Sequence, residues 1–262
     1  LAAILNNAQP GTSISLYGAY TLDAAATVKN GVSLYVMDGS PSYGTGSLAA
    51  SARLTGAPGG TLWVDKGTTF TGNVDNYGTV ENYGTITGAV SGTGTVINAT
   101  LVNTEQELRD AIAASTGNPI VLGKDIELTS MLNIAVDNVE LDLGGNTITA
   151  ADTFSGTAGY ENDKHLVNVT GDGVTIRNGT LKTTGNNKHA LNIHGAENVA
   201  IENLVVDHTD AFTGAPIVVN GSTVKVQGDL TLITGSASWY GMNVDNKTGE
   251  GTGANTTVTF AE

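Results

Sequence analysis

The sequence predicts an all-β chain folded as a right-handed parallel β-helix, a kind of β-solenoid. One observation is the composition: the 262 residues include 35 glycines, and charged and aromatic residues make up only 14% and 5% of the chain. This composition is typical of a polar β-protein with many turns. A second observation is a short apolar strand that recurs at a fixed period. A third is a helix-like segment at the start of each of two series of such strands.

The fixed period is clearest in the second half of the chain. Val174, Val199 and Val224 follow one another at intervals of 25 residues, and each opens a strand in which apolar and polar residues alternate. Asn178 and Asn203 share the same offset and are expected to stack. Copies this short bury their apolar faces only by stacking on one another. A β-sandwich built from hairpins is the alternative, but it gives no reason for a side-chain pattern to keep a fixed period.

A longer repeat divides the chain into two tandem units, residues 1–100 and 101–262. Ile14 and Leu16 match Ile120 and Leu122 at an offset of 106 residues. Residues 104–107 (TEQE) form a capping box, which predicts a helix over 104–116 at the start of the second unit. A shorter helix is expected at the beginning of the first unit. Both helices would cap the open end of their unit.

Residues 61–100 form a tighter array within the first unit. Asn76-Tyr77 and Asn82-Tyr83 are each followed by Gly-Thr and lie six residues apart. We interpret this segment as a series of shorter turns of the solenoid, or a β-rich cap. The alternative is that Tyr77 and Tyr83 form an aromatic stripe on which sugars stack.

Charge and cysteine content narrow the classes of partner. Residues 1–100 carry three basic and five acidic side chains and residues 101–262 carry eight and twenty, which gives a net charge of −14. Such a surface repels phosphate backbones and anionic lipid, so we expect no nucleic-acid partner and no membrane insertion. The chain has no cysteine, which fits an exported bacterial protein. We expect a monomer, excised from a longer secreted or cell-surface protein.

The sequence resembles the pectin-lyase-like superfamily of right-handed parallel β-helices. The matching features are the opener at residues 104–128 and the phrases at 174–179 (VTIRNG) and 199–203 (VAIEN). The low charge and the capped tandem units are most similar to adhesin-like repeat regions of bacterial surface proteins. The superfamily also contains lyases and hydrolases, so the resemblance implies the fold and leaves the activity open.

Active enzymes of that superfamily place their chemistry on the outward face of the first sheet. Here the outward positions carry mostly amides, namely Asn168, Asn192, Asn220 and Asn243, with Asp245 as the one carboxylate. A hydrolase needs paired carboxylates, and a lyase needs a cationic base beside acidic calcium ligands. We therefore predict no catalytic residues.

One group of residues is a candidate for ligand binding. Lys188 and His189 enter one strand, Trp239 and Tyr240 occupy the equivalent entry later in the chain, and Asn192 and His194 lie on the strand that follows His189. The functional interpretation is one edge of a glycan groove, with Trp239 or Tyr240 as the stacking surface. The structural interpretation is ordinary stacking of like residues at equivalent turns.

Asp207 and Asp210 are the candidate metal ligands. Oxygen-rich loops bind calcium, although Asp-x-x-Asp in a turn also caps backbone amides. No other cofactor is expected.

Three functions follow in order of preference. The first is a non-catalytic, adhesin-like module that binds or displays surfaces for a glycan or a protein of the host or cell surface. The second is a carbohydrate-active enzyme, either a polysaccharide lyase or a glycoside hydrolase. The third is a structural stalk.

Overall fold

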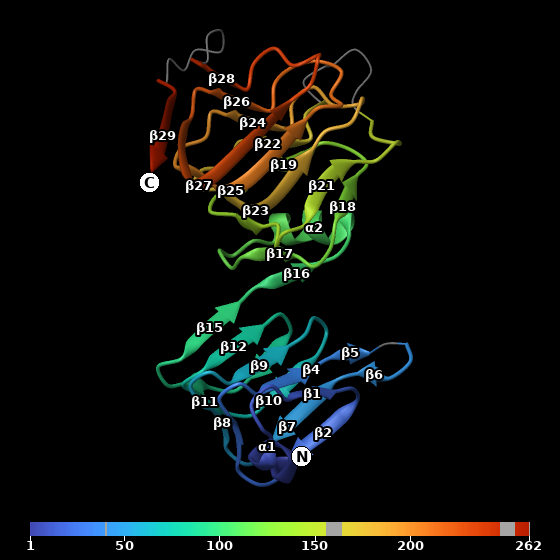
Figure 1. Cartoon of the computed structure of the whole chain (residues 1–262), viewed down its shortest axis with the longest axis vertical. Helices are drawn as coiled ribbons and strands as arrows, with labels where there is room; N and C mark the ends of the chain where they lie inside the picture. Colours follow the sequence, from blue (N-terminus) through green and yellow to red (C-terminus); the bar gives the residue numbers. More distant parts are fainter. Residues whose placement is uncertain (40, 156–163, 247–254, 262) are drawn as a thin grey trace. The chain divides into compact units, whose positions relative to one another are not determined.

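Parallel β-sheets are the main regular structure of the chain (Figure 1). The computed structural model describes residues 1–39, 41–155, 164–246 and 255–261. The prediction of an all-β chain with parallel sheets is confirmed. The chain forms two compact units, Leu1–Thr100 and Leu101–Glu262. Within the described residues, no helix combines the length and the apolar character needed to cross a membrane.

Unit 1 opens with helix α1 (Ala2–Asn7) and contains three parallel sheets. The five-stranded sheet has the order β1 (Ser13–Leu16), β4 (Ser33–Val36), β9 (Thr61–Val64), β12 (Thr79–Asn82) and β15 (Thr95–Asn98). One four-stranded sheet runs β13 (Thr85–Thr87), β10 (Thr69–Thr71), β7 (Ser47–Ala50) and β2 (Ala19–Leu22). The other runs β14 (Val90–Ser91), β11 (Val74–Asn76), β8 (Leu54–Gly56) and β3 (Ala26–Val28). A small antiparallel pair consists of β5 (Asp38–Gly39) and β6 (Gly44–Thr45).

In each parallel sheet of unit 1, every new turn of the chain adds one strand beside the strand of the previous turn. Leu34 on β4 therefore pairs with Ile14 on one side and Leu62 on the other. Leu34 and Leu62 are buried together with Leu5 of α1 in the same core. In the segment 61–100 the passages are short, because Thr79 pairs with Thr61 and with Thr95.

Unit 2 contains two parallel sheets. The larger has the path β16 (Thr100–Val102), β17 (Ile120–Leu122), β20 (Glu140–Asp142), β23 (Thr175–Lys182), β25 (Val199–His208), β27 (Thr223–Thr234) and β29 (Thr257–Ala261), with β18 (Ile126–Leu128) and β21 (Thr147–Ala150) paired alongside. The smaller has the order β19 (Leu132–Ile134), β22 (Val167–Val169), β24 (Leu191–His194), β26 (Ile217–Asn220) and β28 (Met242–Asp245).

The period of 25 residues sets the register of the larger sheet. Val199 pairs with Val224, and Ile176 pairs with Ile201, in parallel. Asn178 and Asn203 adopt the left-handed conformation, with φ of 57° and 47°. The Asn203 amide nitrogen lies 3.5 Å from the Asn178 amide oxygen, the stacked arrangement expected from their spacing. These two residues turn the chain inside long strands, where only Gly, Asn and Asp tolerate a positive φ well.

Helix α2 (Glu105–Ala113) precedes β17 and packs on unit 2 through Leu108 and Ile112, both buried. The Thr104 hydroxyl accepts a hydrogen bond from the Glu107 amide, as a capping box requires. The Glu107 carboxylate reaches back to the amide of Asn103, one residue before the cap. The helix is shorter than the predicted 104–116, since it ends at Ala113, four residues before Gly117 takes a φ of 92°.

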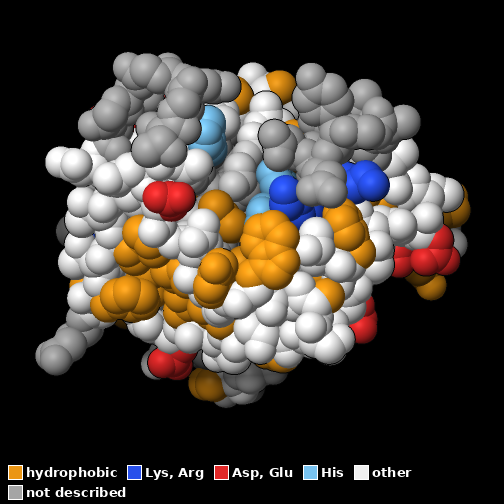
Figure 2. All heavy atoms as spheres, turned by 90° about the horizontal axis from the view of Figure 1, so that it is seen from above, with side chains coloured by type: hydrophobic (Ala, Val, Ile, Leu, Met, Phe, Trp, Pro, Cys, Tyr) orange, Lys and Arg blue, Asp and Glu red, His pale blue; other side chains and the backbone are white. Residues whose placement is uncertain are grey.

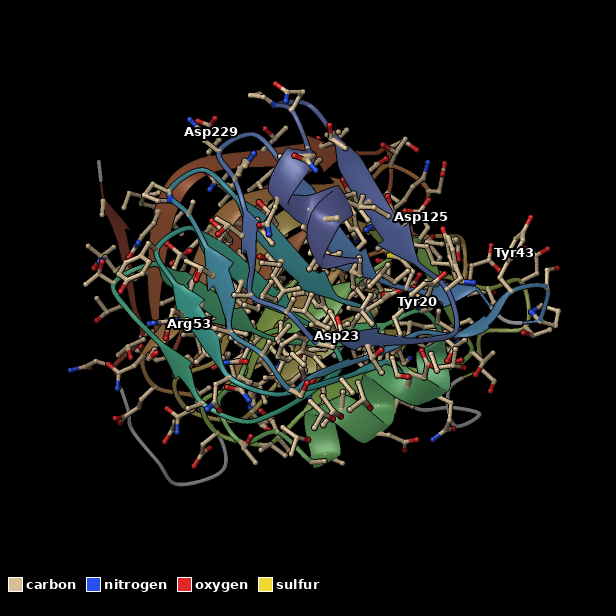
Figure 3. The ribbon with its side chains drawn as sticks, turned by 90° about the horizontal axis from the view of Figure 1, so that it is seen from below. Tyr20, Asp23, Tyr43, Arg53, Asp125 and Asp229 are labelled. Atoms are coloured by element: carbon tan, nitrogen blue, oxygen red, sulfur yellow. The ribbon has the colours of Figure 1, made fainter. Side chains whose placement is uncertain are left out.

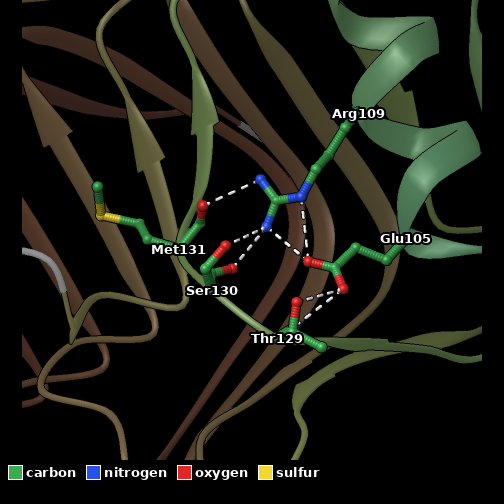
Figure 4. A network of polar contacts seen from close by, with 5 residues as sticks. All are labelled: Glu105, Arg109, Thr129, Ser130 and Met131. Carbon is green, nitrogen blue, oxygen red and sulfur yellow. Dashed lines mark hydrogen bonds and ion pairs between the residues drawn. The ribbon is translucent and has the colours of Figure 1, made fainter. Parts of the chain in front are cut away.

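A polar network ties α2 to the turn between β18 and β19 (Figure 4). The Arg109 guanidinium donates to Glu105 and to the carbonyl oxygens of Ser130 and Met131, at 2.7 to 3.1 Å. The other Glu105 oxygen accepts from the amide and hydroxyl of Thr129 at 3.0 and 2.9 Å. Arg109 thus serves two turn carbonyls and a carboxylate at once, so the helix cannot leave the sheet without exposing all of them.

Replacing Arg109 by Met should destabilise the protein by about 1–3 kcal/mol, because the carbonyls and the Glu105 carboxylate lose a charged donor. The measurement is urea unfolding followed by circular dichroism. Gln106→Ala is the matched control, since Gln106 is exposed on the same helix and its side chain donates to Asp110. Equal losses in the two variants would show that the network does not hold the helix in place.

Candidate functional site

A polar groove of about 420 Å³ runs along the outward face of the smaller sheet of unit 2. This volume lies within the range of small-ligand sites. The groove, called here the sheet groove, is lined by Met131, His165, Asn168, His189, Asn192, His194, Val218 and Asn220. The sheet groove therefore contains three of the predicted ligand-binding residues: His189, Asn192 and His194.

Asn168 and Asn192 of the sheet groove belong to a stack of asparagines that also includes Asn133. Asn133, Asn168 and Asn192 occupy the same register position on β19, β22 and β24. The Asn168 side-chain nitrogen donates to the Asn133 oxygen at 2.8 Å, and the Asn192 nitrogen donates to the Asn168 oxygen at 2.7 Å. All the donors point the same way, so the amides form a ladder with a defined polarity. The next strand, β26, carries Val218 at this position.

Aromatic rings stack at the strand entries beside the ladder. The His165 and His189 rings are stacked with centroids 4.9 Å apart, and the Trp239 ring meets His189 edge-on at 6.0 Å. Both histidines are almost fully buried, at 5% and 6% exposure, whereas Trp239 is 56% exposed. These three residues are called the aromatic cluster. The stacking of like residues expected from the sequence holds for the histidines, while Trp239 adds an exposed ring to their end.

His189 is neutral at physiological pH. His189 Nδ1 lies 2.9 Å from the amide nitrogen of Ala215 and 3.3 Å from its carbonyl oxygen, and in the neutral ring protonated on Nε2 it accepts from the amide. Burial is the main cause that lowers the pKa of His189 to about 4. The charges of Lys188 and His208 act in the same direction, and the hydrogen bond with the Ala215 backbone opposes them. The sheet groove therefore contains an uncharged imidazole at this position.

His208 is a fully buried histidine held beside the aromatic cluster. Its Nε2 lies 2.7 Å from the Lys188 carbonyl oxygen, which can only accept. Its Nδ1 lies 2.8 Å from the Ser238 hydroxyl, next to Trp239. Burial lowers the pKa of His208, and the Lys188 carbonyl and Asp207 oppose this effect. His208 was not among the residues predicted to function, although its place after Leu204 and Val206 in the inward alternation of β25 indicates burial.

Two lysines lie over exposed rings at this end of unit 2. Lys188 Nζ is 5.7 Å from the centroid of the Trp239 ring, and Lys164 Nζ is 5.3 Å from that of Phe212. Figure 2 shows hydrophobic side chains gathered beside lysine or arginine and histidine side chains on one face. Tyr240 is 60% exposed. Lys188 and Trp239 thus lie next to the sheet groove, because both are close to His189. Phe212 was not among the ligand-binding residues predicted from the sequence.

Of the predicted metal ligands, Asp207 lies near the end of β25 and Asp210 lies in the turn that follows. One Asp207 oxygen accepts from the amide and hydroxyl of Thr209, at 3.0 and 2.6 Å, and the other lies 3.7 Å from Lys182 Nζ. Partial burial raises the pKa of Asp207, but the Thr209 hydrogen bonds and the Lys182 charge together lower it. In the described part of the chain, no three His, Asp or Glu side chains are grouped to hold a metal ion. Calcium binding by Asp207 and Asp210 stays a prediction.

Unit 1 has exposed aromatic side chains of its own. Tyr20 and Tyr43 are 41% and 72% exposed (Figure 3). The ring of Tyr43 lies 5.5 Å from that of Tyr17. Tyr83 packs against Trp63 at 4.5 Å, while Tyr77 is exposed. Tyr77 and Tyr83 therefore differ in surroundings, which supports the interpretation that segment 61–100 is structural.

Comparisons of this chain with protein-family models, curated proteins and solved structures give no match. The resemblance to the pectin-lyase-like superfamily therefore stays a prediction.

The neutral state of His189 makes stability depend on pH. Its pKa is lower in the folded protein than the usual value of 6.5, so the unfolded chain binds the extra proton first. The contribution of neutral His189 to the free energy of unfolding should be fully present above pH 6.5. It should fall by about 3 kcal/mol as the pH drops toward 4.

His189→Asn keeps an acceptor for the Ala215 amide and removes the titrating ring. We expect this variant to be less stable at pH 7.5 but to lose less stability than wild type between pH 6.5 and 4. Urea unfolding across this range measures the difference. Parallel pH profiles would contradict the assignment of a buried neutral imidazole.

Proposed function

We propose that the chain is a non-catalytic, adhesin-like module of a secreted or cell-surface bacterial protein that binds a neutral glycan in the sheet groove. The observation that carries the proposal is the amide ladder of Asn133, Asn168 and Asn192 beside the aromatic cluster. Amides donate and accept hydrogen bonds without charge, which suits sugar hydroxyls. An exposed ring offers an apolar surface for the C–H face of a sugar.

The proposed architecture is a right-handed parallel β-helix in each unit, related to the pectin-lyase-like superfamily. Its support is the steady addition of one strand to each sheet per passage of the chain, with inward apolar and outward polar columns. Most crossover connections between parallel strands are right-handed. A stack of this kind presents a long, rigid outward face, on which ladder residues keep a fixed spacing.

The chemistry of the groove supports binding without cleavage. The described residues that line it are amides, imidazoles, Met131 and Val218. Glycoside hydrolysis generally uses a pair of carboxyl groups. His189 has a pKa of about 4 and is neutral at physiological pH. A binding module is therefore favoured over a carbohydrate-active enzyme or a structural stalk.

The first test is a screen of neutral oligosaccharides against the full chain, followed by calorimetry on the best ligand. Trp239→Ala should weaken binding about 10-fold, which corresponds to about 1.4 kcal/mol. Tyr43→Ala is the matched control, because it removes an exposed ring from unit 1 and should leave the affinity unchanged.

Mass spectrometry of the ligand after long incubation completes the test. An intact ligand agrees with a binding module, and shortened products would favour an enzyme instead. Absence of binding across the screen would leave the stalk as the function.

A further inference from the structure

The amide ladder of the sheet groove has a gap of one strand. Asn133, Asn168 and Asn192 continue through Val218 on β26 to Asn243 on β28, all in one register column. Four of the five positions are asparagine, and valine interrupts them. Val218 is only 9% exposed, so it forms the apolar floor of the gap.

The gap leaves hydrogen-bonding groups on both of its sides. Asn192 uses its nitrogen to reach Asn168, and no donor among the described residues reaches its oxygen. Within the same part of the chain, no hydrogen bond engages the Asn243 side chain. In a ladder with this polarity, Asn192 offers an acceptor toward the gap and Asn243 offers a donor. Strands lie about 4.8 Å apart, so the two asparagines are separated by about 9.6 Å, twice the repeat of a stacked amide ladder.

We propose that this gap is a binding site for the acetamido group of an N-acetylated sugar, which supplies the missing amide of the ladder. The ligand N–H donates to the Asn192 oxygen, the ligand carbonyl accepts from the Asn243 nitrogen, and the methyl group packs on Val218. A trans secondary amide points its N–H and its carbonyl in opposite directions, so one group can satisfy both sides. This proposal rests on the proposed glycan function and names its substrate class.

The surroundings of the gap favour a sugar over a peptide. A peptide bound by strand addition needs a free strand edge. Strand β26 has none, because it is paired on both sides by β24 and β28. The groove next to the gap instead offers the ring of His189 and the amide of Asn168. These are neutral groups for the hydroxyls and ring of the same sugar.

The test compares two oligosaccharides that differ only at the acetamido position. Chitohexaose carries an N-acetyl group on each ring, and cellohexaose has the same β-1,4 backbone with hydroxyl groups instead. Calorimetry on the full chain should show chitohexaose binding about 10-fold more tightly, as expected for two added hydrogen bonds. Equal affinities would overturn the acetamido site and leave the glycan function standing. Binding of neither sugar, together with a negative neutral-glycan screen, would overturn both.

Val218→Asn provides the sharpest variant, because it completes the ladder with an amide of the protein. We expect the preference for chitohexaose to fall to near unity in this variant. Val218→Ala is the matched control, since it shortens the floor without adding an amide and should keep most of the preference. A preference that survives Val218→Asn would contradict the proposal.

Asn243→Leu tests the other side of the gap on the outermost strand, where a substitution disturbs packing least. Loss of its donor should reduce the preference while circular dichroism stays unchanged. Tighter binding of a blocked Asn-rich peptide than of chitohexaose would assign the gap to peptide recognition and overturn the sugar proposal.

Discussion

Parallel strand pairing in a fixed register is the constraint on which the rest of the structure depends. The paired strands of unit 2 place their residues beside those of the previous passage, with one register shift between Glu202 and Leu204 where β25 pairs with β27. Within a paired stretch, a slip by one residue would exchange the two faces. The inward column therefore keeps Ile176, Ile201 and Val226 fully or almost fully buried. The same register that fills the core also lines up the outward asparagines, so the core and the ladder have one cause.

Stacked amides are stabilising only where the strand spacing matches the length of a hydrogen bond between successive side chains. Asn133, Asn168 and Asn192 meet that condition, with nitrogen–oxygen distances of 2.8 and 2.7 Å. Val218 is the one residue other than asparagine in this column of five residues. Departures from local consistency concentrate at functional sites in natural proteins. The gap is therefore more informative than the ladder around it.

The sequence was sufficient for features that depend on local chemistry or on a fixed offset. The capping box at Thr104 and the pairing of Val199 with Val224 both follow from short patterns. The outward positions, Val218 included, could also be assigned by alternation. Hydrogen-bond direction in the ladder could not, because it depends on side-chain torsions that no spacing fixes.

The aromatic cluster shows a second limit of the sequence. Trp239 reaches His189 because the chain passes close by at Gly214, whose φ is 103° and where a Cβ would collide with the Lys188 carbonyl oxygen and the His189 ring. Loop lengths alone do not predict such an approach. The Arg109 network shows the same limit. The sequence places Arg109 in the predicted helix, but the carbonyl oxygens of Ser130 and Met131 that it contacts lie in a turn more than 20 residues away.

The net charge of −14 is a weak guide to this site, since charge acts locally in salt solution. Exposed charges farther apart than about 8 Å are largely screened at physiological ionic strength. Lys188 lies over the Trp239 ring of the aromatic cluster, and Lys164, the neighbour of His165 in the chain, lies over Phe212. Among the described residues that line the groove, none is an aspartate or a glutamate. Under the proposed glycan function, selectivity at the groove would come from uncharged donors and acceptors, and the pair at Asn192 and Asn243 would decide which sugar is held.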